Sequence, residues 1–119
     1  MSIRVVIKGK AGVLRAHNPE RYKKPIAQTV EKHTRLQANK ASDRAPVDTG
    51  LLAGSIPASV KPINGDQTAW SYGSPVIYAD VQEYTHKTKK GFMRKAAFEG
   101  EQPFVEDISK TVQRVARGN

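Results

Sequence analysis

Hydrophobic and polar residues alternate at the start of the chain, and this pattern predicts a β-strand over residues 3–8. The stretch "IRVVIK" places Ile3, Val5 and Ile7 on one side, as a strand with one buried face requires. Gly9 follows and interrupts the pattern. We therefore expect a short strand that ends at a turn.

A helical pattern follows over about residues 24–43. Apolar or weakly polar residues recur there in steps of three and four, at Ile26, Val30, His33, Leu36 or Gln37, and Ala41. Asn18-Pro19 resembles a helix start, but Pro25 inside a helix that began there would cost about 3 kcal/mol. The expected helix therefore begins with Pro25 in its first turn.

Further strands are expected in the middle of the chain, over about residues 51–61, 68–72 and 76–84. Residues 64–66, "NGD", are a strong turn signal between the first two strands. The residues that share a face are Trp70 and Tyr72 in the second strand, and Ile77, Ala79 and Val81 in the third. The pattern predicts an antiparallel meander, in which Gly54 and Pro57 weaken the first strand and place it at a sheet edge.

The last part of the chain divides into a stretch without a clear period, 85–102, and a helix over about 103–116. The first stretch is expected to be a long basic loop. Pro103 opens the helix, and apolar residues then repeat at helical spacing, at Phe104, Ile108, Val112 and Val115. Together the elements predict one α+β domain over 1–119, with a long helix packed on a small antiparallel β-sheet, a C-terminal helix and a long basic loop.

The charge balance narrows the choice of partners. The chain of 119 residues has 20 Lys and Arg against 11 Asp and Glu, a net charge of +9, and no cysteine. The excess favours association with polyanions, although a solvated basic surface explains it equally well. The absence of cysteine excludes disulfides and thiolate metal sites. The first apolar run is broken at Arg4 and is too short for a signal peptide or a membrane span, so a soluble chain is expected.

Asp48-Thr49-Gly50 is the triplet that carries the catalytic carboxylate of aspartic proteases. In those enzymes the triplet follows an apolar strand, and a dimeric enzyme needs a second pair of apolar residues before a glycine. Here the triplet follows the charged segment "NKASDRAP", and none of the glycines from Gly65 onward follows two apolar residues. We therefore do not expect a peptidase.

The same segment is better explained as a joint between a helix and the next element. A proline ends the helix near Arg44, polar side chains bond nearby amides, and a glycine supplies a turn dihedral. The residues of this joint are Pro46, Asp48, Thr49 and Gly50.

Other catalytic and metal-binding patterns have little support. The three histidines, His17, His33 and His86, are far apart and include no pair at i,i+4. His33 is expected to be a helix-face residue. No nucleophile elbow, phosphate loop or dinucleotide fingerprint occurs, and Glu83 has no companion for acid–base chemistry. The sequence predicts no enzyme activity, cofactor or metal.

The basic segment has three interpretations. It could follow a phosphate backbone with Phe92 stacked on a base, form a surface loop, or become ordered when a neighbouring subunit covers it. The residues expected at such an interface are Lys87, Lys89, Lys90, Phe92, Met93, Arg94 and Lys95.

Several motifs in this order resemble the head–tail connector, or tail-completion, proteins of long-tailed double-stranded DNA phages. The first and most specific is "APVDTG" after a helix. The motifs are Ala45–Gly50, Leu51-Leu52, Ser55-Ile56 in a strand, Tyr78-Ala79 with Glu83-Tyr84 in a later strand, and Pro103-Phe104 in the last helix. They span about residues 24–117. The chain departs from the family at Thr85-His86, where members often have Gly-Thr.

The resemblance implies an architectural role without catalysis. Copies would form a ring in the phage neck or tail end, and would contact a head-closure or connector protein and a tail tube or tail terminator protein. The resemblance also implies weak contact with packaged DNA and no contact with a membrane. The protein would occupy the virion, and the host cytoplasm before assembly. The alternative is a nucleic-acid-binding module that uses residues 85–95.

Overall fold

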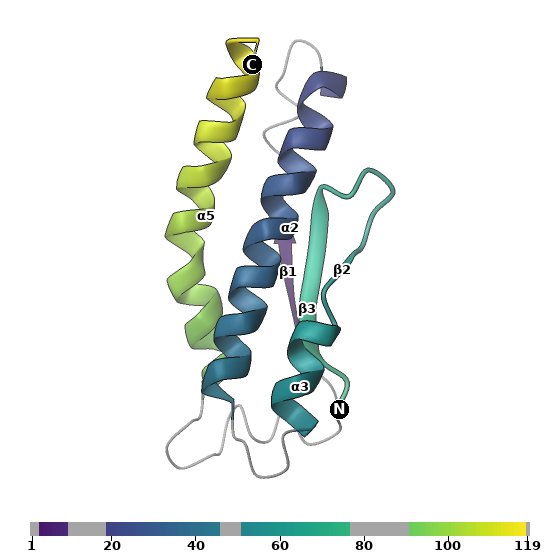
Figure 1. Cartoon of the computed structure of the whole chain (residues 1–119), viewed down its shortest axis with the longest axis vertical. Helices are drawn as coiled ribbons and strands as arrows, with labels where there is room; N and C mark the ends of the chain where they lie inside the picture. Colours follow the sequence, from purple (N-terminus) through teal and green to yellow (C-terminus); the bar gives the residue numbers. More distant parts are fainter. Residues whose placement is uncertain (1–2, 10–18, 46–50, 77–90, 119) are drawn as a thin grey trace.

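The structure is a computed structural model, and it describes residues 3–9, 19–45, 51–76 and 91–118. The elements in chain order are β1 (Ile3–Lys8), α2 (Pro19–Arg44), α3 (Leu51–Ala58), β2 (Lys61–Pro62), β3 (Ala69–Ser74) and α5 (Phe92–Ala116). Helices α2 and α5 run side by side along the long axis, and α2 also packs on the sheet (Figure 1). The predicted α+β class, with a long helix on a small antiparallel sheet, is confirmed.

The sheet has three antiparallel strands in the order β1-β3-β2. The predicted strand 3–8 is confirmed, and the predicted strand 68–72 is shifted to β3. In the β1–β3 register Val5 faces Tyr72 and Ile7 faces Trp70; Ile7, Trp70 and Tyr72 belong to the core, and Val5 packs against it partly buried. The predicted turn also forms, because the Asn64 side chain bonds Thr68 and the Ala69 amide.

The strand predicted over 51–61 is wrong, because residues Leu51–Ala58 form helix α3. Leu52 and Ile56, four residues apart, are its buried side chains, a spacing that fits a helix. Pro57 cannot donate to the carbonyl of Ala53, but the Ser42 hydroxyl of α2 donates to that carbonyl at 2.8 Å. Only Lys61-Pro62 remain as a strand. The strand implied at Ser55-Ile56 is therefore helical.

The main helix also begins earlier than predicted, at Pro19 rather than near residue 24. Pro25 lies inside it, at a cost of about 3 kcal/mol. Burial of Ile26 and Val30 offsets this cost, since both are fully buried and each contributes about 1.5–3 kcal/mol. The predicted end near Arg44 is confirmed.

The predicted loop over 85–102 is wrong for residues 92–102, which belong to helix α5. Gly91 precedes the helix in the left-handed conformation, with φ of 77°, and its carbonyl accepts from the Lys95 amide at 2.8 Å. The predicted helix over 103–116 is thus the second half of a longer helix. Pro103 lies inside it and does not open it, because buried apolar residues continue on the same face before it.

The third predicted strand, 76–84, lies outside the described residues except for Val76, which packs partly buried against the core. Among the described strands, β3 has β1 on one side and β2 on the other. The first strand of the chain, β1, therefore pairs with the middle strand, β3. The predicted meander did not include this pairing.

A row of polar contacts holds α2 against α5, and we call it the interhelical seam. Its members are Thr29, His33 and Gln37 of α2 and Thr111, Asp107 and Gly100 of α5. The two threonine hydroxyls are 2.8 Å apart, and His33 Nε2 is 2.7 Å from Asp107 Oδ2. Gln37 accepts a hydrogen bond of 2.9 Å from the Tyr72 hydroxyl of β3, so the seam also connects to the sheet.

Candidate functional site

The structure divides the seven predicted interface residues into three groups. Lys87, Lys89 and Lys90 lie outside the described residues. Phe92 and Met93 are not at a surface, since they are 1% and 0% exposed in the core. The predicted contact role of these two is wrong, because the helical period places both on the buried face of α5.

Arg94 and Lys95 are exposed in the first turn of α5. They line a shallow depression with Gly91, Phe98 and Glu99. Lys95 is one of the cations that lower the pKa of Glu99, although the hydrogen bond from Arg44 is the main cause. This end of α5 is therefore basic and exposed, as the sequence predicted for these two residues.

The four residues of the predicted structural joint lie outside the described residues. They are Pro46, Asp48, Thr49 and Gly50. Ala45 is described just before them and is fully buried.

His33 is a helix-face residue, as predicted, and its ring is buried at the interhelical seam. It packs edge-on against the Phe104 ring, with the ring centroids 5.5 Å apart. The hydrogen bond from His33 and a second one from Lys32 hold the pKa of Asp107 below its ordinary value of 3.8. Within the described ranges, no group of three or more His, Asp and Glu side chains could hold a metal ion.

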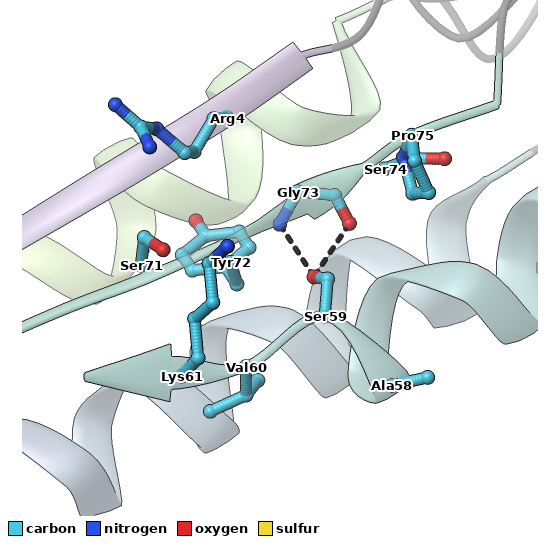
Figure 2. Close-up of a pocket in the computed structure, with 10 residues that line it drawn as sticks. All are labelled: Arg4, Ala58, Ser59, Val60, Lys61, Ser71, Tyr72, Gly73, Ser74 and Pro75. Atoms are coloured by element: carbon cyan, nitrogen blue, oxygen red, sulfur yellow. Dashed lines mark hydrogen bonds between the residues drawn. The ribbon is translucent and has the colours of Figure 1, made fainter. Parts of the chain in front are cut away.

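A pocket of about 480 Å³ opens beside β3 and the end of α3, and we call it the outer pocket (Figure 2). Arg4, Lys61 and Ser71 line it from three neighbouring strands. Lys61 is opposite Ser71 in the register, and Arg4 is opposite Gly73, so all belong to the sheet face turned away from Tyr72.

Ser59 joins the outer pocket to the sheet through the backbone of Gly73 (Figure 2). Its hydroxyl accepts from the Gly73 amide at 2.8 Å and lies 2.7 Å from the Gly73 carbonyl oxygen. The side chain thus takes the place of a ladder partner just before the start of β2. Ser71 is 1% exposed, and its buried hydroxyl has no hydrogen-bond partner among the described residues.

The outer pocket is better suited to binding an oxyanion than to catalysis. Two cations and a free hydroxyl can stabilise a carboxylate or phosphate oxygen. Its described lining has no imidazole or carboxylate that could act as a general base on a serine.

The second surface is a groove beside β1. The groove, of about 360 Å³, lies between residues 5–8 of β1 and residues 97–105 of α5, and we call it the edge groove. Three of the exposed large apolar side chains line it: Phe98 at 79%, Val105 at 50% and Val6 at 37%. An apolar groove of this kind is typical of an interaction surface.

The edge groove runs along an edge of β1 that no described strand pairs. The Gly9 amide donates to the Thr68 carbonyl at 2.8 Å, which fixes the alternation of the antiparallel ladder. The backbone polar groups of Val5 and Ile7 therefore point to β3, and those of Arg4, Val6 and Lys8 point to the other side. No described strand pairs there. These groups are a template for an added strand.

The opposite edge of the sheet is protected. Strand β2 has only two residues, and Pro62 offers no amide donor. The two edges thus differ: among the described strands, only β1 combines six residues, an edge that no other described strand pairs, and an apolar groove.

Sequence reasoning did not identify Phe98 and Val105 as surface residues of this kind. Phe98 falls in the stretch where Gly100 and Pro103 hide the helical period, so it was assigned to a loop. The repeat of Phe92, Ala96 and Gly100 at four-residue steps was the available signal for a helix.

No described helix is both long and apolar enough to cross a membrane. Comparison of the chain with protein-family models, with curated proteins and with solved structures yields no match.

Proposed function

We propose that this protein is a structural component of the neck or tail end of a long-tailed double-stranded DNA phage. Copies form a ring that joins the DNA-filled head to the tail. The ring contacts a head-closure or connector protein and a tail tube or tail terminator protein. No catalytic step and no cofactor are part of this proposal. The sequence motifs from Ala45–Gly50 to Pro103-Phe104 support it.

The observation that carries the proposal is the edge groove. The outer edge of β1, which no described strand pairs, lies next to exposed phenylalanine and valine side chains and is a surface that another chain can cover. Added strands give affinity through the backbone and specificity through side chains in the groove. This suits a protein that functions by assembly.

Burial of the interface lowers the free energy of assembly. Phe98 and Val105 would each contribute about 1.5–3 kcal/mol if a neighbour covered them fully. The interaction would use one patch of a copy against a different patch of the next copy, which is the type of contact that closes a ring.

The test is complementation of a phage whose copy of this gene is deleted. Phe98→Asp should fail to restore infectious particles, because a buried charge without a partner is costly. Leu36→Asp is the matched control, since Leu36 is a 53% exposed leucine on α2 away from the edge groove. Restoration by both variants, with wild-type yield, would contradict the proposal.

The second candidate function is a nucleic-acid-binding module, favoured by the cations Arg4, Lys8 and Lys61 on one face of the sheet. Phe92 cannot stack on a base as that interpretation required, because it is buried. A binding module would hold DNA at physiological salt, with affinity that falls steeply as salt rises. The joining protein should bind DNA only weakly under the same conditions.

A further inference from the structure

We infer that the edge groove receives residues 77–84 of a second copy of this chain, which pair with β1 as an added antiparallel strand. The inference rests on the proposed function, since it names the head-to-tail contact that a ring needs. The stretch "IYADVQEY" is rich in β-branched and aromatic residues, as strands are, and contains Asp80 and Glu83 but no Lys or Arg.

The two faces of an extended 77–84 stretch match the two sides of the edge groove. Alternation places Ile77, Ala79 and Val81 on one face. That face would meet the apolar side, where Val5 and Ile7 belong to or pack on the core. The apolar residues would extend the layer between the sheet and α5.

The other face of the stretch contains Asp80, and the corresponding face of β1 contains Arg4, Val6 and Lys8. If Asp80 lies opposite Val6, it has one cation on each diagonal. Diagonal neighbours across strands are about 7–8 Å apart, within reach of long side chains. The edge is basic and the stretch is acidic, so their charges are complementary in a chain whose net charge is +9.

Two copies of β1 are poor partners for each other. Antiparallel pairing centred on Val6 would place Arg4 of one copy opposite Lys8 of the other, on both sides of the centre. Like charges directly opposite each other destabilise a strand pair. The charge pattern therefore disfavours a two-fold dimer and favours a contact between different patches, which leads to a ring.

The chain's own 77–84 stretch is also a poor occupant. Strand β3 ends at Ser74, which pairs with Ile3 at the start of β1. An antiparallel strand with Asp80 opposite Val6 would instead begin with Ile77 near Gly9, at the other end of β1. That distance is about 20 Å for a strand of six residues, whereas the three steps from Ser74 to Ile77 span at most about 11 Å.

Charge exchange between two variants tests the inference. The first variant combines Arg4→Glu with Lys8→Glu, and the second is Asp80→Lys. Each alone should lose the concentration-dependent self-association of the wild-type chain in sedimentation velocity. An equimolar mixture should regain self-association. The acidic edge of the first variant then meets the introduced lysine of the second, and the basic edge of the second meets the unchanged Asp80 of the first, as in the wild-type contact.

The control combines Lys24→Glu with Lys110→Glu, exposed positions away from the edge groove that change the net charge by the same amount as the first variant. It should associate like the wild-type chain. Circular dichroism confirms that each variant is folded.

Three results would overturn the inference. They are a wild-type chain that stays monomeric at its solubility limit, variants that associate as well as wild-type, and a mixture that does not regain association. Lower thermal stability of the first two variants as monomers, without rescue on mixing, would identify the chain's own stretch as the occupant. None of these results bears on the deletion phenotype, so failure of the inference is distinguishable from failure of the proposed function.

Discussion

Nε2 of His33 on α2 lies 2.7 Å from Oδ2 of Asp107 on α5, and this contact fixes how the two long helices are aligned. Arg44 and Glu99 form an ion pair at one end of the helix pair, and Arg21 donates to the Val115 carbonyl at the other. The alignment matters for the edge groove, because it sets the position along β1 at which the exposed side chains of α5 lie.

Asp107 should make the stability of the fold sensitive to acid. Its pKa is lowered in the folded state, so its contribution is present above the ordinary value of 3.8 and is lost as the pH falls through the lower, folded value. Asp107→Asn should reduce the free energy of unfolding at pH 7 by about 1 kcal/mol, because a charged acceptor becomes a neutral one.

Urea unfolding at pH 7 and at pH 3 measures this effect. The difference in stability between the two pH values should be smaller in Asp107→Asn than in wild-type. Asp43→Asn, at an exposed position on α2, is the control and should leave that difference unchanged. An equal difference in Asp107→Asn and wild-type would count against the role of the His33–Asp107 contact.

Two glycines in helices should respond to alanine with opposite signs. A Cβ at Gly100 would lie 2.5 Å from Cγ of Gln37, whereas a Cβ at Gly54 would meet nothing within 4 Å. Gly54→Ala should stabilise the protein by about 0.5–1 kcal/mol through helix propensity. Gly100→Ala gains the same helix propensity, but its methyl group overpacks the interhelical seam at a cost of about 1–3 kcal/mol. The substitution should therefore destabilise the fold. Thermal melts of the two variants decide this, and stabilisation of both would be inconsistent with the close packing at Gly100.

Phe92 should behave as a core residue. Phe92→Ala should lower the free energy of unfolding by about 3–5 kcal/mol, because the side chain is 1% exposed. Lys95→Ala, one turn later and exposed, should change it by less than about 0.5 kcal/mol. Equilibrium urea denaturation measures both. A Phe92→Ala variant as stable as wild-type would instead support the surface role that the sequence suggested.

The hydroxyl of Ser42 should matter only while residue 57 is a proline. Ser42→Ala leaves the Ala53 carbonyl without its 2.8 Å donor and should cost about 1–2 kcal/mol. In a Pro57→Ala background the new amide can donate to that carbonyl within α3, so the same change should cost less. A double-mutant cycle measures the coupling, and additive effects would refute the explanation of why α3 tolerates Pro57.

Much of the fold follows from local pattern in the sequence. Alternation predicts β1 and β3, the "NGD" turn predicts the hairpin before β3, and steps of three and four predict most of α2 and the second half of α5. Local pattern does not predict helix α3, because its short apolar stretch contains Gly54 and Pro57. Its helical state depends on a hydrogen bond from Ser42 in another helix, which no local pattern reveals.

The candidate site was less predictable. The edge groove combines Val6 with Phe98 and Val105, and only the tertiary fold brings these residues together. Charge suggested an interface near Arg94 and Lys95 but could not distinguish exposed from buried neighbours. Phe92 and Met93 were therefore assigned to the interface, although the helix turns both toward the core.

Electron microscopy of particles from a phage that lacks this gene tests the proposed joining role most directly. The account predicts DNA-filled heads and separate, complete tails in the same lysate, with joined virions restored when the wild-type chain is supplied. Normally joined, infectious virions in the absence of the chain would contradict it.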